Sequence, residues 1–208
     1  MVTMVQMMTD DPVWRGEYVP DADQRIVLNG VDWSGFETML ALRGERSSPR
    51  MTYLDGVLEI MSPSRYHENI KSMIGRVLEA YCLDREIPFA AYGSWLLKKK
   101  PKKTGVEPDE CYVFADDPTT KHRPDIAIEV IWTSGGIDKL EVYKRLGVDE
   151  VWMWERDAIT AYGLAGGRYG KRPRSAWLPE LDLQMICRAA HHKTINAAVA
   201  EMRAATRR

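Results

Sequence analysis

Three charged residues in the second half of the chain have the types and the spacing to bind a cation and act on a phosphate. Asp109 and Glu129 each interrupt an apolar run with the composition of a strand, and Lys139 follows on a helical pattern. A buried carboxylate is costly unless a partner compensates its charge. A divalent cation is the simplest shared partner for two converging carboxylates. The sequence therefore predicts Asp109 and Glu129 as ligands of Mg²⁺ or Mn²⁺.

Such a set of residues suits phosphodiester hydrolysis. A bound metal polarises the phosphate and lowers the pKa of a bound water, and a nearby lysine stabilises the charge that develops. Lys139 is the predicted lysine. Each residue also has a structural interpretation. Asp109 could cap a strand end, Glu129 could form a buried salt bridge, and Lys139 could be a solvated helix residue.

Two further residues are candidates for the same site. Glu59 could add a metal ligand and a catalytic carboxylate, or it could be a solvent-facing hairpin residue. His67 could orient a phosphate, or it could simply start a helix. A basic loop between two expected strands could contact a phosphate backbone or be a solvated hairpin tip. Its candidate contacts are Lys98, Lys99 and Lys100.

Composition limits the function classes. The chain has 208 residues, 45% hydrophobic and 28% charged, as expected for one globular domain. Its net charge of -1 gives no global basic field, so nucleic acid would have to bind a local patch. Three separated cysteines without a CxxC pair predict neither disulfides nor structural zinc. With no signal peptide and no apolar run of membrane-spanning length, we expect a cytoplasmic protein.

The elements that must position these residues follow from periodicity and turn chemistry. Ser34 and Glu37 match a capping box for a first helix that ends at Gly44. Asp55-Gly56 predicts a hairpin between residues 51–54 and 57–61. A second helix is expected from 62–64 to about Arg85. The remaining expected elements are strands at 89–92, 94–97, 106–114, 126–132 and 150–154, a helix at 137–146, a hairpin over 159–169, and a last helix at 195–203.

This order predicts an α/β fold with a mixed central sheet flanked by helices. We expect a flexible arm at residues 1–24, one domain at 25–190 and a helical tail at 191–208.

Several motifs in chain order resemble those of the Uma-two family, which is assigned to the PD-(D/E)XK, restriction-endonuclease-like superfamily. The resemblance runs from about Arg25 to Ile186. The motifs are Gly56–Pro63 with His67-Glu68, Glu107–Tyr112, Pro124–Val130, Asp138-Lys139 with Tyr143, and Gly147–Trp152.

The resemblance implies an αβββαβ core, a divalent metal held by Asp109 and Glu129, and activity as an endonuclease on DNA. Ile131 stands where the superfamily pattern E-x-K has its lysine, and the resemblance places the lysine at Lys139 instead. Cutting two strands needs two sites, so a homodimer is the expected assembly.

Two other functions remain open from the sequence. The first is a non-catalytic module that binds nucleic acid or protein on the same fold, because a fold does not fix a function. The second is an enzyme that acts on a small phosphorylated substrate.

Overall fold

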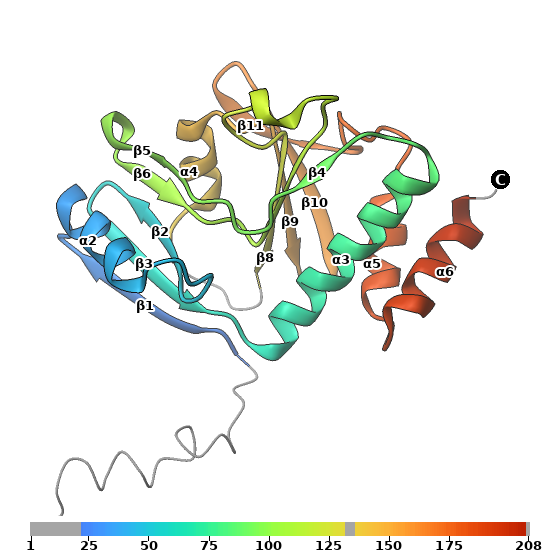
Figure 1. Cartoon of the computed structure of the whole chain (residues 1–208), viewed down its shortest axis with the longest axis horizontal. Helices are drawn as coiled ribbons and strands as arrows, with labels where there is room; N and C mark the ends of the chain where they lie inside the picture. The colour runs from blue at the N-terminus through green and yellow to red at the C-terminus, as the bar shows by residue number, and fades with distance from the viewer. Residues whose placement is uncertain (1–21, 132–135, 207–208) are drawn as a thin grey trace, which may run out of the picture.

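The strands form two sheets that lie next to each other, the first at the left and the second near the centre of Figure 1. The computed structural model describes residues 22–131 and 136–206. The first sheet has the order β1-β3-β2-β6-β5 and is antiparallel, with strands β1 (Gln24–Asn29), β2 (Arg50–Leu54), β3 (Val57–Ser62), β5 (Leu97–Lys99) and β6 (Thr104–Val106).

The second sheet is mixed and has the order β11-β10-β9-β8-β7-β4. Strands β8 and β9 pair in parallel, and the other neighbours pair antiparallel. Its strands are β4 (Ala90–Ala91), β7 (Glu110–Val113), β8 (Ile126–Ile131), β9 (Glu150–Glu155), β10 (Ala158–Ala165) and β11 (Arg168–Arg172).

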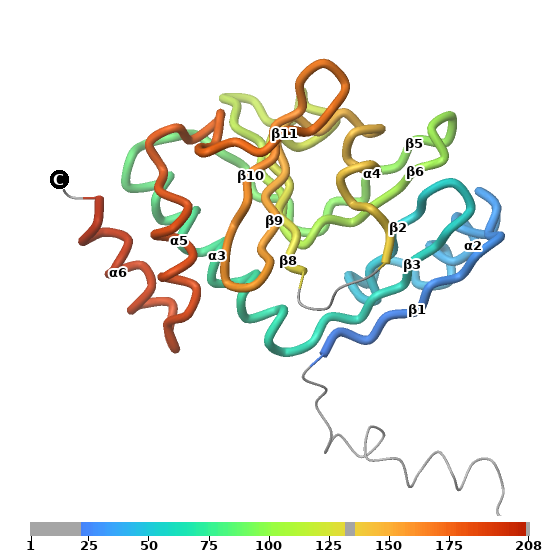
Figure 2. Tube along the Cα trace, turned by 180° about the vertical axis from the view of Figure 1, so that it is seen from behind, coloured from blue at the N-terminus to red at the C-terminus, as the bar shows by residue number. Residues whose placement is uncertain are grey.

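Helices cover both sheets (Figures 1 and 2). Helices α3, α5 and α6 cover one face of the second sheet, α4 lies on its other face, and α2 packs on the first sheet. The helices are α2 (Trp33–Arg43), α3 (Arg65–Asp84), α4 (Lys139–Leu146), α5 (Leu183–Ala190) and α6 (Ile195–Thr206), with short 3₁₀ turns η1 (Lys100–Lys102) and η2 (Pro118–Thr120). The predicted α/β class with helices on a mixed sheet is confirmed.

Local sequence signals account for several boundaries. Asp55 and Gly56 both have positive φ, which gives the β2–β3 hairpin the turn that its dipeptide predicts. The Ser64 side chain accepts a hydrogen bond from the His67 N–H at 3.2 Å and caps α3. Helix α4 ends at Gly147 in the left-handed region.

Alternation along the strands decides which side chains meet. On β3, Leu58 and Ile60 pack toward α2, so Glu59 points to the opposite face. On β8, Ile128 packs with α3, while Ala127 packs with α4. Glu129 therefore shares the α4 side of its sheet, where the first sheet also presents Glu59.

The structure corrects three expectations. Helix α2 begins at Trp33, and its cap is the Asp32 side chain, which accepts the Gly35 N–H at 2.7 Å. The Ser34–Glu37 capping box was therefore wrong. The predicted strand 106–114 divides into β6 and β7, which belong to different sheets. Strand β1 was not predicted, because three consecutive apolar residues hide the alternation of an edge strand.

The predicted domain limits stay predictions. Most of the arm predicted at 1–24 lies outside the described residues, as does Trp132, predicted to end the strand of Glu129. Of the arm's last residues, Asp23 is buried and Gln24 begins β1. None of the helices within the described ranges has the length and apolar character needed to cross a bilayer.

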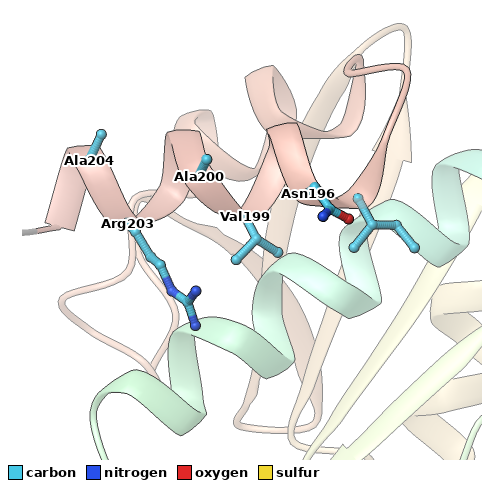
Figure 3. Close-up of a pocket in the computed structure, with 6 residues that line it drawn as sticks. Asn196, Val199, Ala200, Arg203 and Ala204 are labelled. Atoms are coloured by element: carbon cyan, nitrogen blue, oxygen red, sulfur yellow. The ribbon is translucent and has the colours of Figure 1, made fainter.

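The C-terminal helix α6 lies against α3. Figure 3 shows Val199 and Arg203 directed toward α3, where Arg203 binds Asp84 at 2.7 and 2.9 Å. A cavity of about 550 Å³ runs along α6 and takes its lining from that helix alone. Its charged lining residue is already ion-paired, so this cavity offers little chemistry.

Candidate functional site

Asp109 lies where the chain passes from the first sheet to the second. The segment Glu107–Asp109 connects β6 to β7, and Asp109 is 1% exposed. Its Oδ2 accepts the N–H of Val130 at 2.7 Å, which places this carboxylate next to Glu129 on the neighbouring strand. Its Oδ1 binds the Arg50 guanidinium. The two predicted ligands thus lie side by side, Asp109 just before β7 and Glu129 on β8.

Glu107 holds this passage in place. Its carboxylate accepts the N–H of Met51 at 2.9 Å and also binds Arg43. Pro108 has no N–H to donate to a ladder. The break between β6 and β7 therefore has a physical cause, and it turns Asp109 inward.

Glu129 is buried on β8 and receives two groups from α4. Its Oε1 accepts the Tyr143 hydroxyl, and its Oε2 lies 3.6 Å from the Lys139 ammonium. Lys139 and Tyr143 are four residues apart, so they share one face of the helix. The Lys139 side chain is 16% exposed, so it is not the solvated helix lysine of the alternative interpretation.

Glu59 joins the same group of side chains from the first sheet. Its Oε1 lies 4.0 Å from the Lys139 ammonium, which also donates to the Thr52 hydroxyl at 2.7 Å. Glu59 is 2% exposed, so the solvent-facing interpretation was wrong. Gly136 has φ 101° and passes so close that a Cβ there would overlap the Glu59 carboxylate. A glycine is required at this position.

A cavity of about 250 Å³ opens onto Glu59, Glu129 and Lys139, with Arg25 and Tyr162 among the residues around it. Asp109 does not line this cavity and lies behind Glu129. The negative charge of Asp109 nevertheless affects Glu129. Burial raises the pKa of Glu129, the nearby Lys139 ammonium opposes that rise, and the Asp109 carboxylate adds to it.

His67 is fully buried and links two acids. Its Nε2 lies 3.0 Å from Asp109 Oδ1, and its Nδ1 lies 3.0 Å from Asp23 Oδ2. The predicted phosphate contact by His67 is therefore not available in this structure, because no part of the ring reaches the surface. The imidazole instead positions Asp109.

These contacts set unusual protonation states. Burial of the His67 ring opposes its charged form, but hydrogen bonds with Asp109 and Asp23 outweigh that effect and raise the pKa of His67 to about 9. Burial would raise the pKa of Asp109, but His67 and Arg50 lower it to about 2. We therefore expect an imidazolium and a carboxylate at neutral pH.

Folding stability in metal-free buffer should fall as the pH rises from about 6.5 to 9. The His67 pKa is raised in the folded state, so its contribution is complete below the unfolded pKa and is lost as pH passes through the folded value. The loss is at most roughly 3 kcal/mol. Urea unfolding at both ends of this range measures it. In His67→Gln the fall of the unfolding free energy over this pH range should disappear. If the variant and the wild type show the same fall, the raised pKa of His67 is not its cause.

The donor set can be compared with what a divalent cation needs. A carboxylate has about four lone-pair sites. Asp109 uses three of them, for Arg50, His67 and the Val130 N–H, whereas Glu129 uses one for Tyr143. Hard oxygen atoms with free lone pairs fit Mg²⁺ or Mn²⁺. Among the described residues, however, no three acidic, histidine or cysteine side chains are already grouped as a metal site. The carboxylates are instead neutralised by internal cations.

The three predicted lysine contacts lie elsewhere. Lys98 binds Glu37 at 2.9 Å, and Lys99 and Lys100 are exposed. None of the three lines the cavity that holds Glu129. The structure does not bring them to the carboxylates.

Sequence reasoning missed several partners of the acids. Arg50 is 6% exposed and bridges Asp109 and Glu68, and Thr52 anchors Lys139. Nothing in the sequence distinguishes a buried arginine at a strand start from an exposed one. Tyr143 did carry a signal, which was its spacing of four residues from Lys139.

Comparison with known proteins gives a family. A family model described as "Uma2: Putative restriction endonuclease" matches residues 35–190. A crystal structure of "a putative nuclease belonging to DUF820 from Anabaena variabilis ATCC 29413" is similar at 14% identity and a TM-score of 0.46, covering 78% of this chain and 96% of that one. No curated protein matches. Because the family match spans most of the chain, this protein belongs to the Uma2 family.

Proposed function

We propose that this protein is a metal-dependent endonuclease that hydrolyses phosphodiester bonds in DNA. One observation carries the proposal. The Lys139 ammonium lies between the carboxylates of Glu129 and Glu59 at the edge of a cavity, with Asp109 just before the strand next to that of Glu129. Membership of a family described as restriction endonucleases supports the same activity.

Asp109 and Glu129 are the proposed ligands of Mg²⁺ or Mn²⁺, with Glu59 as an auxiliary carboxylate. When bound, the metal would polarise the phosphate and lower the pKa of a water. Tyr143 donates to Glu129 and so fixes the direction of that carboxylate. Arg50 and His67 keep Asp109 ionised, which a ligand must be.

Lys139 is the proposed charge stabiliser. Its ammonium is held by the Thr52 hydroxyl and faces the cavity. A fixed cation at this place would stabilise the negative charge that builds on the phosphate during attack by water. Because Thr52 belongs to the first sheet, this ammonium is positioned by an element other than its own helix.

Supercoiled plasmid tests the proposal. Wild-type protein should convert it to nicked or linear DNA with Mg²⁺ or Mn²⁺, and chelation by EDTA should stop the reaction. Glu129→Gln keeps the shape of the side chain and removes its charge, so it should abolish both cleavage and Mn²⁺ binding measured by calorimetry. Wild-type and variant proteins with the same cleavage and the same Mn²⁺ isotherm would overturn the assignment.

A control variant separates the site from general charge effects. Glu155→Gln changes another acid that lines the same cavity but makes no hydrogen bond or ion pair with Lys139 or Tyr143 in the described part of the chain. It should leave Mn²⁺ binding within about twofold of wild type, because a change away from the ligands has little effect.

A second candidate is a non-catalytic module on the same fold. The observation that favours it is that Glu59, Asp109 and Glu129 each already form an ion pair with a basic side chain of the protein. DNA binding without metal-dependent cleavage would support this candidate.

We also propose that the protein forms a homodimer, because the two strands of a DNA duplex would then meet two sites. Sedimentation of the full chain would measure it.

A further inference from the structure

We propose that a second cavity, at the other end of α4 from the carboxylates, binds an unpaired stretch of the polynucleotide substrate through its phosphates and a base. We name it the Trp95 cavity. Its volume is about 320 Å³, and it lies between β5, the loop before β8 and the end of α4. The lining residues are Trp95, Leu96, Leu97, Lys98, Lys99, His122, Arg123 and Leu146. The proposal rests on the proposed function, because it adds a contact for the same substrate.

The lining of this cavity favours an anion. It contains two lysines, an arginine and a histidine, and no acidic side chain. Lys98 is partly neutralised by Glu37 at 2.9 Å, and Arg123 lies 3.9 Å from Asp149. Lys99 and His122 have no ion-pair partner among the described residues. Since the whole chain has a net charge of -1, this is a local concentration of positive charge, as phosphate binding requires.

Aromatic rings add a second kind of contact. Trp95 lines the cavity, and the ring of Tyr92 lies 5.1 Å from it between centroids. Tyr92 is 41% exposed. Bases of a single strand stack on such rings whatever their sequence, whereas bases in a duplex are already stacked. The combination of cations and aromatic rings therefore fits an unpaired segment better than a duplex.

The cavity is placed to act together with the catalytic residues. Lys139 is the first residue of α4 and Leu146 is the last, so the two sites lie at opposite ends of one helix. Eight residues of helix span roughly 10 Å. One nucleotide of a stacked duplex strand advances about 3.4 Å along the axis. An unpaired strand extends further for each nucleotide, so the separation corresponds to at most roughly three nucleotides. A substrate held at the Trp95 cavity could thus reach Glu129.

Binding in EDTA tests the cavity separately from catalysis. Fluorescence anisotropy would measure the affinity of the full chain for a labelled single-stranded DNA, the same RNA sequence, and the DNA duplex. The wild type should bind single strands more tightly than the duplex, with DNA and RNA showing whether the sugar matters. The double variant Lys99→Glu, Arg123→Glu should weaken single-strand binding by about tenfold or more at low salt, and the log–log salt slope should become shallower.

Two more variants complete the design. Trp95→Leu should weaken single-strand binding by about fivefold to tenfold through lost stacking and leave the salt slope unchanged. Lys193→Glu reverses a single charge, half the change of the double variant, on an exposed residue between α5 and α6, and it should change affinity by less than twofold. Thermal melting of each variant would establish that it is folded.

The outcomes separate the two proposals. If cavity variants lose binding while wild type shows no metal-dependent cleavage, the Trp95 cavity stands and the endonuclease proposal fails. If cleavage occurs but Lys99→Glu, Arg123→Glu binds like Lys193→Glu, the cavity proposal is overturned. A wild-type chain that binds none of the three probes in EDTA, or that prefers the duplex, also overturns it.

Discussion

Lys139→Met is expected to lower the rate of plasmid cleavage by about 10²–10³-fold. Methionine keeps an unbranched apolar stem of similar length and removes the ammonium that lies between Glu129 and Glu59. The fixed positive charge that we propose to lie near the scissile phosphate is thereby lost. Initial rates with saturating Mn²⁺ would measure the effect.

Metal binding distinguishes a lost charge stabiliser from a damaged site. In Lys139→Met the Mn²⁺ affinity should be equal to or higher than in wild type, because a cation that repels the metal has gone. Lys144→Met, on the more exposed side of α4 and paired with Glu141, serves as the matched control and should cleave at the wild-type rate. Equal cleavage by Lys139→Met and wild type would show that the nuclease activity arises elsewhere.

Arg50→Met is expected to lower the free energy of unfolding by about 3 kcal/mol or more. Arg50 is 6% exposed and binds both Asp109 and Glu68. Among the described residues, its removal leaves the buried Asp109 with His67 as its one cationic partner. A buried charge that loses its partner costs several kcal/mol, far more than an exposed ion pair contributes.

Urea unfolding at neutral pH without metal would measure this loss. Arg76→Met removes an arginine that is 57% exposed and should change stability by less than about 0.5 kcal/mol. In the double variant Arg50→Met, Asp109→Asn, part of the stability should return, because the uncompensated acid is also removed. If the double variant is as unstable as the sum of the single changes, the ion pair is not the cause. Saturating Mn²⁺ should stabilise Arg50→Met more than wild type, since the metal would replace the missing cation.

The elements that depend on local signals were predictable. Asp55-Gly56 fixed the β2–β3 hairpin, and the periodicity of 62–85 predicted α3. The helical pattern that follows Lys139 predicted α4, and the four-residue spacing of Lys139 and Tyr143 brings both side chains to Glu129. These signals are contained within a few residues, so the rest of the fold is not needed to interpret them.

Features that depend on long-range contacts were not predictable. The strand predicted at 106–114 is divided because Glu107 binds Met51 and Arg43, which lie more than fifty positions earlier. The burial of Glu59 follows from a helix that enters much later in the chain. Alternation along β3 predicts on which face of the sheet Glu59 lies. Whether that face is buried or exposed depends on the packing of α4.

The three-residue passage from β6 to β7 has a mechanical consequence. The two sheets are hydrogen-bonded separately and are connected there by only three residues. Asp109 is the last residue of this connection. A small slide of one layer over the other would carry Glu59 and Thr52 one way while Glu129 stayed with its own strands. The geometry that holds the ammonium would then fail before either layer unfolds. Loss of catalysis should therefore report loosening between the layers earlier than any spectroscopic measure of secondary structure.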